Sequence, residues 1–105
     1  MNDKPYRSRV VTEGPEHAGN RAHLKCVGLL EDELERPFIG IVNTFNEMNP
    51  GHVHLRSVAE AVKQGVYRAG GVPFEFNTIA ICDGITQGNV GMCSVLPSRD
   101  VIVDS

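Results

Sequence analysis

Residues 38–44, with the sequence FIGIVNT, decide the fold of this 105-residue chain because they are almost continuously apolar and end in polar residues. Such a run is typical of a strand that is buried on both faces of a parallel sheet. Residues 72–82, with the sequence VPFEFNTIAIC, show a similar pattern and are followed by Asp83 and Gly84. We therefore predict two strands, at 38–44 and at 72–82.

The segment between these strands has the pattern of an amphipathic helix. Asn49 suits the capping position of a helix, and Pro50 suits its first turn. Apolar residues then recur every three or four positions until Gly70 and Gly71. These apolar residues are Leu55, Val58, Ala59, Val62, Val66 and Ala69. We predict a helix over about 50–69.

A strand, a helix and a second strand within about 38–82 form a βαβ unit, in which the two strands lie parallel in one sheet. Parallel sheets are normally covered by helices on both faces. The predicted fold class is therefore α/β, and we interpret the chain as the N-terminal part of a three-layer α/β/α domain with a mainly parallel sheet.

Residues 1–36 carry weaker signals. Residues 1–16 lack periodicity and predict an irregular arm. In residues 18–30 the apolar residues recur at roughly helical spacing, and Gly28 lies near the end of this pattern, which predicts a short helix. Residues 31–36 are rich in acidic side chains and predict a solvated connector. We interpret residues 1–36 as an N-terminal arm with one short helix.

The end of the chain has the pattern of a helix that is cut short. Residues 97–100 suit a helix start, but Val101 and Ile102 have barely formed an apolar face when the sequence reaches Ser105. A helix of two turns gains little stability unless it packs and continues. We therefore interpret residues 37–105 as the beginning of an α/β domain that is truncated at its C-terminal end.

Composition and charge restrict the class of partner. With 41% hydrophobic and 22% charged residues, the chain has the composition of a globular protein. Its 10 basic and 13 acidic residues leave no positive excess for a nucleic-acid backbone. No apolar stretch approaches the roughly 18 residues of a membrane span. Cys26, Cys82 and Cys93 form no disulfide framework and no signal peptide is evident, so we expect a cytoplasmic protein.

Asp83 is the strongest candidate for a chemical role. Ligands of open α/β sheets bind beyond the carboxyl ends of the strands, and Asp83 directly follows the second predicted strand. A carboxylate in a glycine-containing loop suits Mg²⁺, which binds one or two carboxylates together with substrate oxygens. The alternative is that Asp83 and Gly84 form a turn in which Asp83 caps the next element. The residue pattern leaves both interpretations open.

Other candidate ligands have weaker support. Cys82 carries the soft thiolate that iron or zinc prefers, but a cysteine at the end of a buried strand is more often a small apolar residue. His52 and His54 lie two positions apart and so do not share a helix face. They fit packing and hydrogen bonding at a helix terminus, unless the first turn is irregular and His52 faces a ligand.

Several motifs together resemble one enzyme family. They are PGHVHL at 50–55, AGGVPFEFNTIA at 69–80, CDGI at 82–85, LPSR at 96–99 and DS at 104–105. These segments closely resemble the N-terminal region of the dihydroxy-acid and phosphogluconate dehydratase family. The opening segment from Tyr6 to Leu29 is also similar to that family, so the resemblance covers nearly the whole chain.

The resemblance implies a hydro-lyase that converts a 2,3-dihydroxy acid into a 2-keto acid in branched-chain amino acid biosynthesis. It implies an iron–sulfur cluster that acts on the departing hydroxyl, and Mg²⁺ that holds the carboxylate end of the substrate. Asp83 matches a magnesium ligand of the family. The family's other ligands and its serine base correspond to positions beyond Ser105. The resemblance therefore implies no catalytic residue and no activity in this segment alone, and a homo-oligomer as the full-length enzyme.

The sequence departs from the family pattern near these positions. Gly51 stands where some members have a cluster cysteine. Thr86, Gln87 and Asn89 stand in a loop that usually reads closer to Gly-Ile-Ala-Met-Gly-His. Because these changes flank Asp83, a sugar-acid or phosphogluconate dehydratase of the same family is an alternative. A noncatalytic α/β binding module is the alternative from another class of protein.

Overall fold

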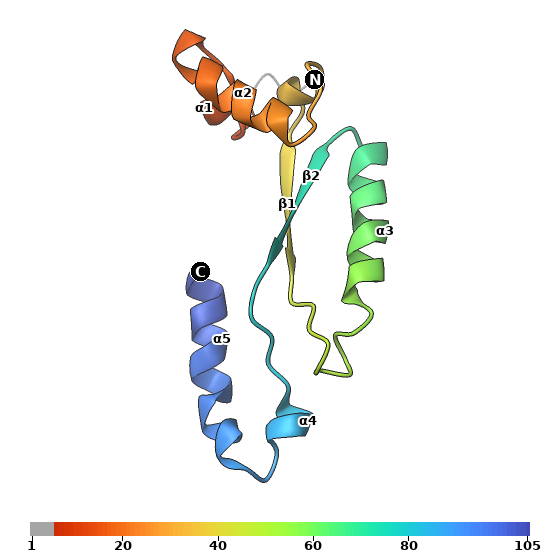
Figure 1. Cartoon of the computed structure of the whole chain (residues 1–105), viewed down its shortest axis with the longest axis vertical. Helices are drawn as coiled ribbons and strands as arrows, with labels where there is room; N and C mark the ends of the chain where they lie inside the picture. The colour runs from red at the N-terminus through yellow and green to blue at the C-terminus, as the bar shows by residue number, and fades with distance from the viewer. Residues whose placement is uncertain (1–5) are drawn as a thin grey trace. The chain divides into compact units, whose positions relative to one another are not determined.

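The computed structural model describes residues 6–105, and Figure 1 labels its helices and strands. Short 3₁₀ helices, which are named η, lie between some of the α-helices and strands. In chain order the elements are α1 (Arg9–Thr12), η1 (Pro15–His17), α2 (Ala18–Cys26), η2 (Glu33–Glu35), β1 (Phe38–Asn43), α3 (Leu55–Arg68), β2 (Val72–Asn77), α4 (Asp83–Thr86), η3 (Val90–Ser94) and α5 (Val95–Asp104).

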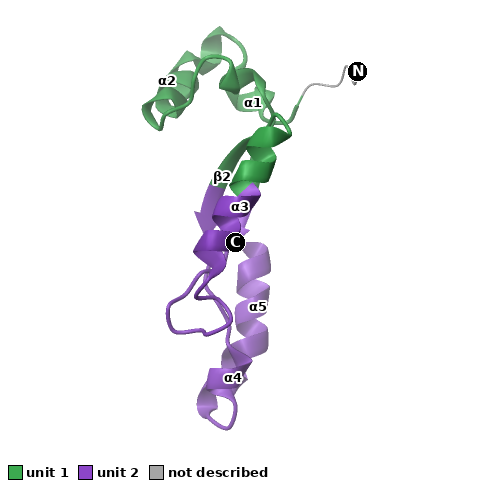
Figure 2. Ribbon diagram, turned by 90° about the vertical axis from the view of Figure 1, so that its right-hand side faces the viewer, with its two compact units in different colours: residues 1–40, 63–74 green, residues 41–62, 75–105 purple. Residues whose placement is uncertain are grey.

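The described residues group into two compact units, which Figure 2 colours separately. Unit 1 contains the described chain up to Gly40 together with Lys63–Phe74. Unit 2 contains Ile41–Val62 and Glu75–Ser105. Each of β1, α3 and β2 contributes residues to both units.

β1 and β2 form a two-stranded parallel sheet. The backbone N–H of Val72 donates to the carbonyl of Pro37 at 2.9 Å, and that of Thr78 donates to the carbonyl of Asn43 at 3.0 Å. Because both residue numbers increase together along the pairing, the strands run in the same direction. The predicted α/β class, with a parallel strand–helix–strand unit, is confirmed.

A small apolar core lies at the end of the sheet that belongs to unit 1. Val72 is only 2% exposed, and the rings of Phe38 and Phe74 meet edge to face with centroids 5.0 Å apart. α3 ends before Gly70, whose φ of 89° is a left-handed conformation that glycine adopts without strain. Gly71 then lets the chain pass close to β1, because a Cβ at this position would lie 3.3 Å from a side-chain carbon of Ile39.

In unit 2, α3 packs along β1. Ala59 of α3 is 5% exposed, and a cavity of about 130 Å³ is lined by residues of both elements. Further along the chain, α5 and α4 each contact η3, and Val95 at the start of α5 is buried. Much apolar surface remains outside these contacts, since Val42 is 63% exposed and Phe76 is 59% exposed.

The N-terminal arm is more regular than predicted. Residues 1–5 of the predicted arm lie outside the described part of the chain, but α1 and η1 occupy residues that were expected to be irregular. Arg21 of α2 explains this order, because its guanidinium donates to the carbonyls of Thr12 and Gly14 at 2.8 and 2.7 Å. Thr12 is the last residue of α1 and Gly14 directly precedes η1, and the bonds come from a residue that a local pattern does not reveal.

Other element boundaries also differ from the prediction. α2 ends at Cys26, and Gly28 follows it with a φ of 105°. α3 begins at Leu55 rather than at about 50, and α5 begins at Val95 rather than near Pro97. Among the described residues, no helix combines the length and hydropathy that crossing a bilayer requires.

Candidate functional site

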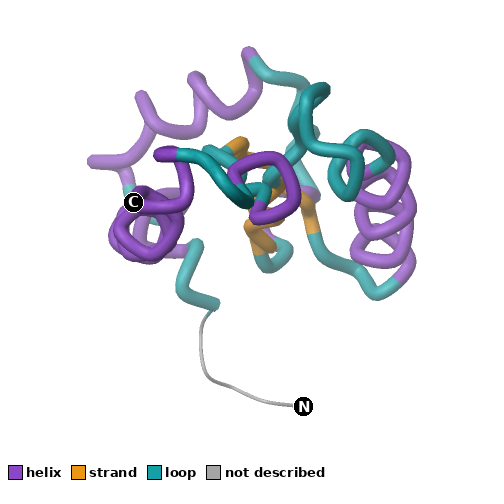
Figure 3. The backbone as a smooth tube through the Cα atoms, turned by 90° about the horizontal axis from the view of Figure 1, so that it is seen from below, coloured by secondary structure: helices purple, strands orange, loops and turns teal. Residues whose placement is uncertain are grey.

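Side-chain hydrogen bonds shape the loop between β1 and α3, residues 44–54, which is teal in Figure 3 like the other loops. Asn46 Oδ1 accepts hydrogen bonds from two backbone N–H groups of this loop, at 2.7 and 3.2 Å. The guanidinium carbon of Arg56 lies 4.1 Å from the centre of the Phe45 ring, which is a cation–π contact. These contacts give the loop a defined path at the carboxyl end of β1.

Asn49 joins this loop to the segment that precedes Asp83. Its side chain donates from Nδ2 to the carbonyl of Ile81 at 2.9 Å, and its Oδ1 accepts from the N–H of Gly51 at 3.0 Å. The residue is 6% exposed. Residues 50–54 form turns and α3 begins only at Leu55, so Asn49 does not cap α3 and the predicted helix start near residue 50 is wrong.

Asp83 is the first residue of α4 and does not directly follow a strand. β2 ends at Asn77, so the predicted strand over 72–82 is too long. The physical reason is the length of the partner strand. β1 ends at Asn43, whose carbonyl accepts from Thr78, and β1 offers no ladder partner beyond that pair.

The Asp83 carboxylate is exposed and makes no hydrogen bond or ion pair within residues 6–105. The cap position of α4 is occupied by Cys82, and no side chain forms a capping hydrogen bond there. The alternative in which Asp83 caps the next element is therefore not observed. The oxygens of this carboxylate are available to a cation from solvent.

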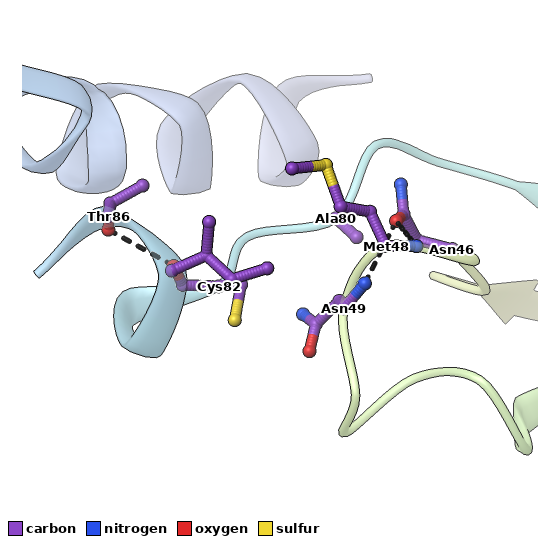
Figure 4. Close-up of a pocket in the computed structure, with 7 residues that line it drawn as sticks. Asn46, Met48, Asn49, Ala80, Cys82 and Thr86 are labelled. Carbon is purple, nitrogen blue, oxygen red and sulfur yellow. Dashed lines mark hydrogen bonds between the residues drawn. The ribbon is translucent and has the colours of Figure 1, made fainter.

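A cavity of about 140 Å³ lies between loop 44–54 and the segment that contains Cys82 and Thr86, and Figure 4 draws the residues that line it. It is lined by Asn46, Met48, Asn49, Ala80, Cys82, Ile85 and Thr86. Thr86 Oγ1 donates to the carbonyl of Cys82 at 3.1 Å, which closes the first turn of α4. Most of the lining is carbon and sulfur, so the half-buried Cys82 thiol has the surroundings of a small apolar residue.

The other sulfur and imidazole groups do not assemble into a metal site. Cys26 and Cys93 are free and exposed. His52 Nδ1 lies 2.7 Å from the carbonyl of Thr44, and because a carbonyl only accepts, this ring nitrogen donates. His52 therefore makes a hydrogen bond as expected, but it lies in a turn before α3 and not at a helix terminus. In the described range 6–105, no three His, Cys, Asp or Glu side chains are placed to hold one metal ion.

Comparison with known proteins identifies the family. Residues 36–105 match the family described as Dihydroxy-acid/6-phosphogluconate dehydratase N-terminal. This chain belongs to the dihydroxy-acid/6-phosphogluconate dehydratase family. The resemblance found in the motifs around Pro50, Gly70 and Asp83 is thereby confirmed.

Three curated proteins that are similar to this dehydratase-family chain are named dihydroxy-acid dehydratase. Dihydroxy-acid dehydratase 1 of Methanosarcina acetivorans is 54% identical over 99 residues, which cover 94% of this chain and 18% of that protein. The dihydroxy-acid dehydratase of Pyrococcus abyssi is 58% identical over the same coverage. That of Methanococcus vannielii is 55% identical over 90% of this chain and 17% of its own length. The chain thus spans less than a fifth of these relatives.

The local sequence around Asn49 predicted a role that the structure does not show. Asn49 before Pro50 and Gly51 fits a helix cap, but an asparagine side chain that bonds the N–H two residues ahead fits the same letters. The observed backbone separates the two interpretations, because residues 50–54 form turns and the helix begins at Leu55. The role of Asp83 as a metal ligand stays a prediction.

Proposed function

We propose that this chain is the N-terminal part of a dihydroxy-acid dehydratase. The reaction removes a proton from C2 and the hydroxyl from C3 of a 2,3-dihydroxy acid as water, and the resulting enol tautomerises to a 2-keto acid. This is the chemistry of branched-chain amino acid biosynthesis. The observation that carries the proposal is the identity of 54 to 58% with dihydroxy-acid dehydratases along 94% of the chain.

We assign a distinct part to each segment. Residues 1–36 form an N-terminal arm, and residues 37–105 begin the catalytic domain. In this assignment the 105-residue chain contributes one metal ligand and no catalytic residue to the complete enzyme, so the isolated chain is inactive. The chain spans only 18% of the length of the Methanosarcina acetivorans relative, which supports assigning the catalytic residues to other parts of the polypeptide.

Asp83 is the residue that we assign to Mg²⁺. Its carboxylate is exposed, lacks a protein partner within residues 6–105 and offers the hard oxygen donors that this ion prefers. These properties fit a ligand that shares the ion with substrate, water and other protein groups. When bound, Mg²⁺ stabilises negative charge that develops at the carboxylate end of the substrate. The contribution of this chain is to present one carboxylate at the start of α4.

The iron–sulfur cluster of the resembled enzymes fits the described cysteines poorly. Cys82 is half-buried in an apolar cavity, Cys26 and Cys93 are exposed, and Gly51 has no thiol. We therefore expect the cluster ligands to lie mainly in other parts of the polypeptide. Cys82 remains the weakest of our ligand assignments.

We further propose that the full-length enzyme is a cytoplasmic homo-oligomer that acts on a small molecule and binds neither nucleic acid nor membrane. The net charge of −3 opposes binding to a phosphate backbone. The three free cysteines fit a reducing compartment. Gel filtration of the full-length enzyme tests the oligomer.

The deciding experiment is a substrate assay. The complete enzyme, with this chain at its N-terminus, is incubated with 2,3-dihydroxy-3-methylbutanoate or with an aldonic acid, and 2-keto acid formation is measured. We expect turnover of the branched substrate by the complete enzyme and none by the 105-residue chain alone. Turnover of the aldonic acid alone selects the sugar-acid alternative, whereas a noncatalytic module would turn over neither compound.

A further inference from the structure

Asn49 uses its side-chain amide to connect two stretches of unit 2 that are distant in sequence. The acceptor oxygen binds Gly51 within its own loop, while the donor nitrogen binds the carbonyl of Ile81. Ile81 precedes Asp83 by two residues and lies in a segment without strand pairing. The bond from Asn49 is therefore a direct restraint on the backbone just before Asp83.

The segment needs such a restraint because its own hydrogen bonds are local. The N–H groups of Thr86 and Gln87 donate to the carbonyls of Cys82 and Asp83, at 3.2 and 2.9 Å. These bonds close one helical turn and do not attach it to the rest of unit 2. A single turn of helix is marginal by itself, so its direction depends on contacts from outside the turn.

We propose that Asn49 is a positioning residue that holds the Asp83 segment against loop 44–54 and thereby sets the affinity of Asp83 for a divalent cation. This inference rests on the proposed role of Asp83. Asn49 touches neither substrate nor metal in this assignment. It acts through the Ile81 carbonyl, as residues behind a metal ligand generally orient that ligand.

Asn89 supplies a matched control from the same unit. Its Oδ1 accepts from the N–H of Gly91 at 2.8 Å, and its Nδ2 donates to the carbonyl of Ile85 at 2.9 Å. The two asparagines thus make the same two kinds of bond. The difference is that both partners of Asn89 lie within four residues of it, so it joins no distant segments.

The test uses the complete enzyme and Mn²⁺, an oxygen-seeking ion that stands in for Mg²⁺, with binding followed by electron paramagnetic resonance. In Asn49→Ser the hydroxyl still accepts from Gly51 but does not reach Ile81. We expect its Mn²⁺ dissociation constant to rise about tenfold, with Asn89→Ser within about twofold of the parent. Equal effects in both variants would overturn the proposal.

The Asn49→Asp variant distinguishes the loss of the restraint on the Asp83 segment from an effect of charge. The aspartate side chain has nearly the same shape as the asparagine that it replaces. It keeps the acceptor for Gly51 and replaces the donor to Ile81 with an oxygen. Its added negative charge alone would strengthen cation binding, whereas loss of the restraint weakens it. We expect weaker Mn²⁺ binding, and stronger binding would overturn the proposal.

Hydrogen exchange gives a readout that does not depend on the metal. In metal-free enzyme, Asn49→Ser should speed amide exchange at Thr86 and Gln87 while leaving exchange within α3 unchanged. If the parent binds no Mn²⁺ through Asp83, the proposed metal role fails, and the exchange rates still decide whether Asn49 restrains the segment. Unchanged exchange at both amides would refute that restraint.

Discussion

Asn43 at the end of β1 donates from its side-chain nitrogen to the carboxylate of Glu75 in β2 at 2.9 Å. The same amide accepts from the backbone N–H of Phe45 at 2.9 Å, and Asn43 is only 5% exposed. One buried side chain therefore joins the two strands and directs the chain into loop 44–54. This arrangement fixes where the sheet ends and where the candidate site begins.

Removing this amide should destabilise the protein. Asn43→Ala loses a hydrogen bond to a charged group and leaves a backbone donor without its partner, so we expect a loss of about 2 kcal/mol in the free energy of unfolding. The chain has no tryptophan, so urea denaturation is best followed by far-UV circular dichroism. Asn77→Ala is the control, because the exposed Asn77 side chain donates to the Asn43 carbonyl over a long 3.4 Å. An equal loss in both variants would contradict this explanation.

Asp83→Asn should weaken divalent cation binding without unfolding the protein. The substitution keeps the shape and removes the charge of an exposed side chain that has no partner in the described chain, so the loss of stability should stay within about 0.5 kcal/mol. We expect the affinity of the complete enzyme for Mn²⁺ to fall at least tenfold, on the order of 1.4 kcal/mol, together with kcat. Asp100→Asn changes another exposed aspartate in unit 2, and this variant should retain the Mn²⁺ affinity and the kcat of the parent enzyme. Ordinary cation affinity in Asp83→Asn would remove this residue from the site.

Two glycines of the α3 segment should respond in opposite directions to alanine. Gly65 lies within α3, and apart from its chain neighbours and the nearby backbone of α3 no atom lies within 4 Å of the position that an added Cβ would take, so Gly65→Ala should stabilise the protein by about 0.5 to 1 kcal/mol. Gly70 also has open space but a φ of 89°, so Gly70→Ala should cost about 1 kcal/mol through backbone strain. Thermal unfolding of the two variants checks the signs. A stabilised Gly70→Ala would show that its left-handed conformation is not required.

The buried valine of β2 should matter more than an exposed valine of β1. Val72 is 2% exposed and Val42 is 63% exposed, although both lie in the same sheet. Val72→Ala removes buried carbon atoms and should lower the free energy of unfolding by about 2 kcal/mol. Val42→Ala should lower it by less than about 0.5 kcal/mol. Chemical denaturation of both variants measures the difference, and equal losses would place the core elsewhere.

The sequence alone determined the parallel strand–helix–strand unit and the family. The run FIGIVNT predicted β1 to within one residue, and the spacing of apolar residues predicted the body of α3. Both signals are local, since they depend on the periodicity of side chains along one element. The motifs that led to the family are also contiguous in the chain, and therefore needed no tertiary information.

Tertiary structure alone decided where the elements stop and what Asn49 does. β2 ends at Asn77 because its partner strand ends, although the apolar pattern continues to Cys82. α3 begins only at Leu55, and the side chain of Asn49, the predicted cap, donates to the carbonyl of the distant Ile81. A hydrogen bond between residues far apart in the chain depends on how both segments are placed in space. The local sequence around either residue does not specify that placement.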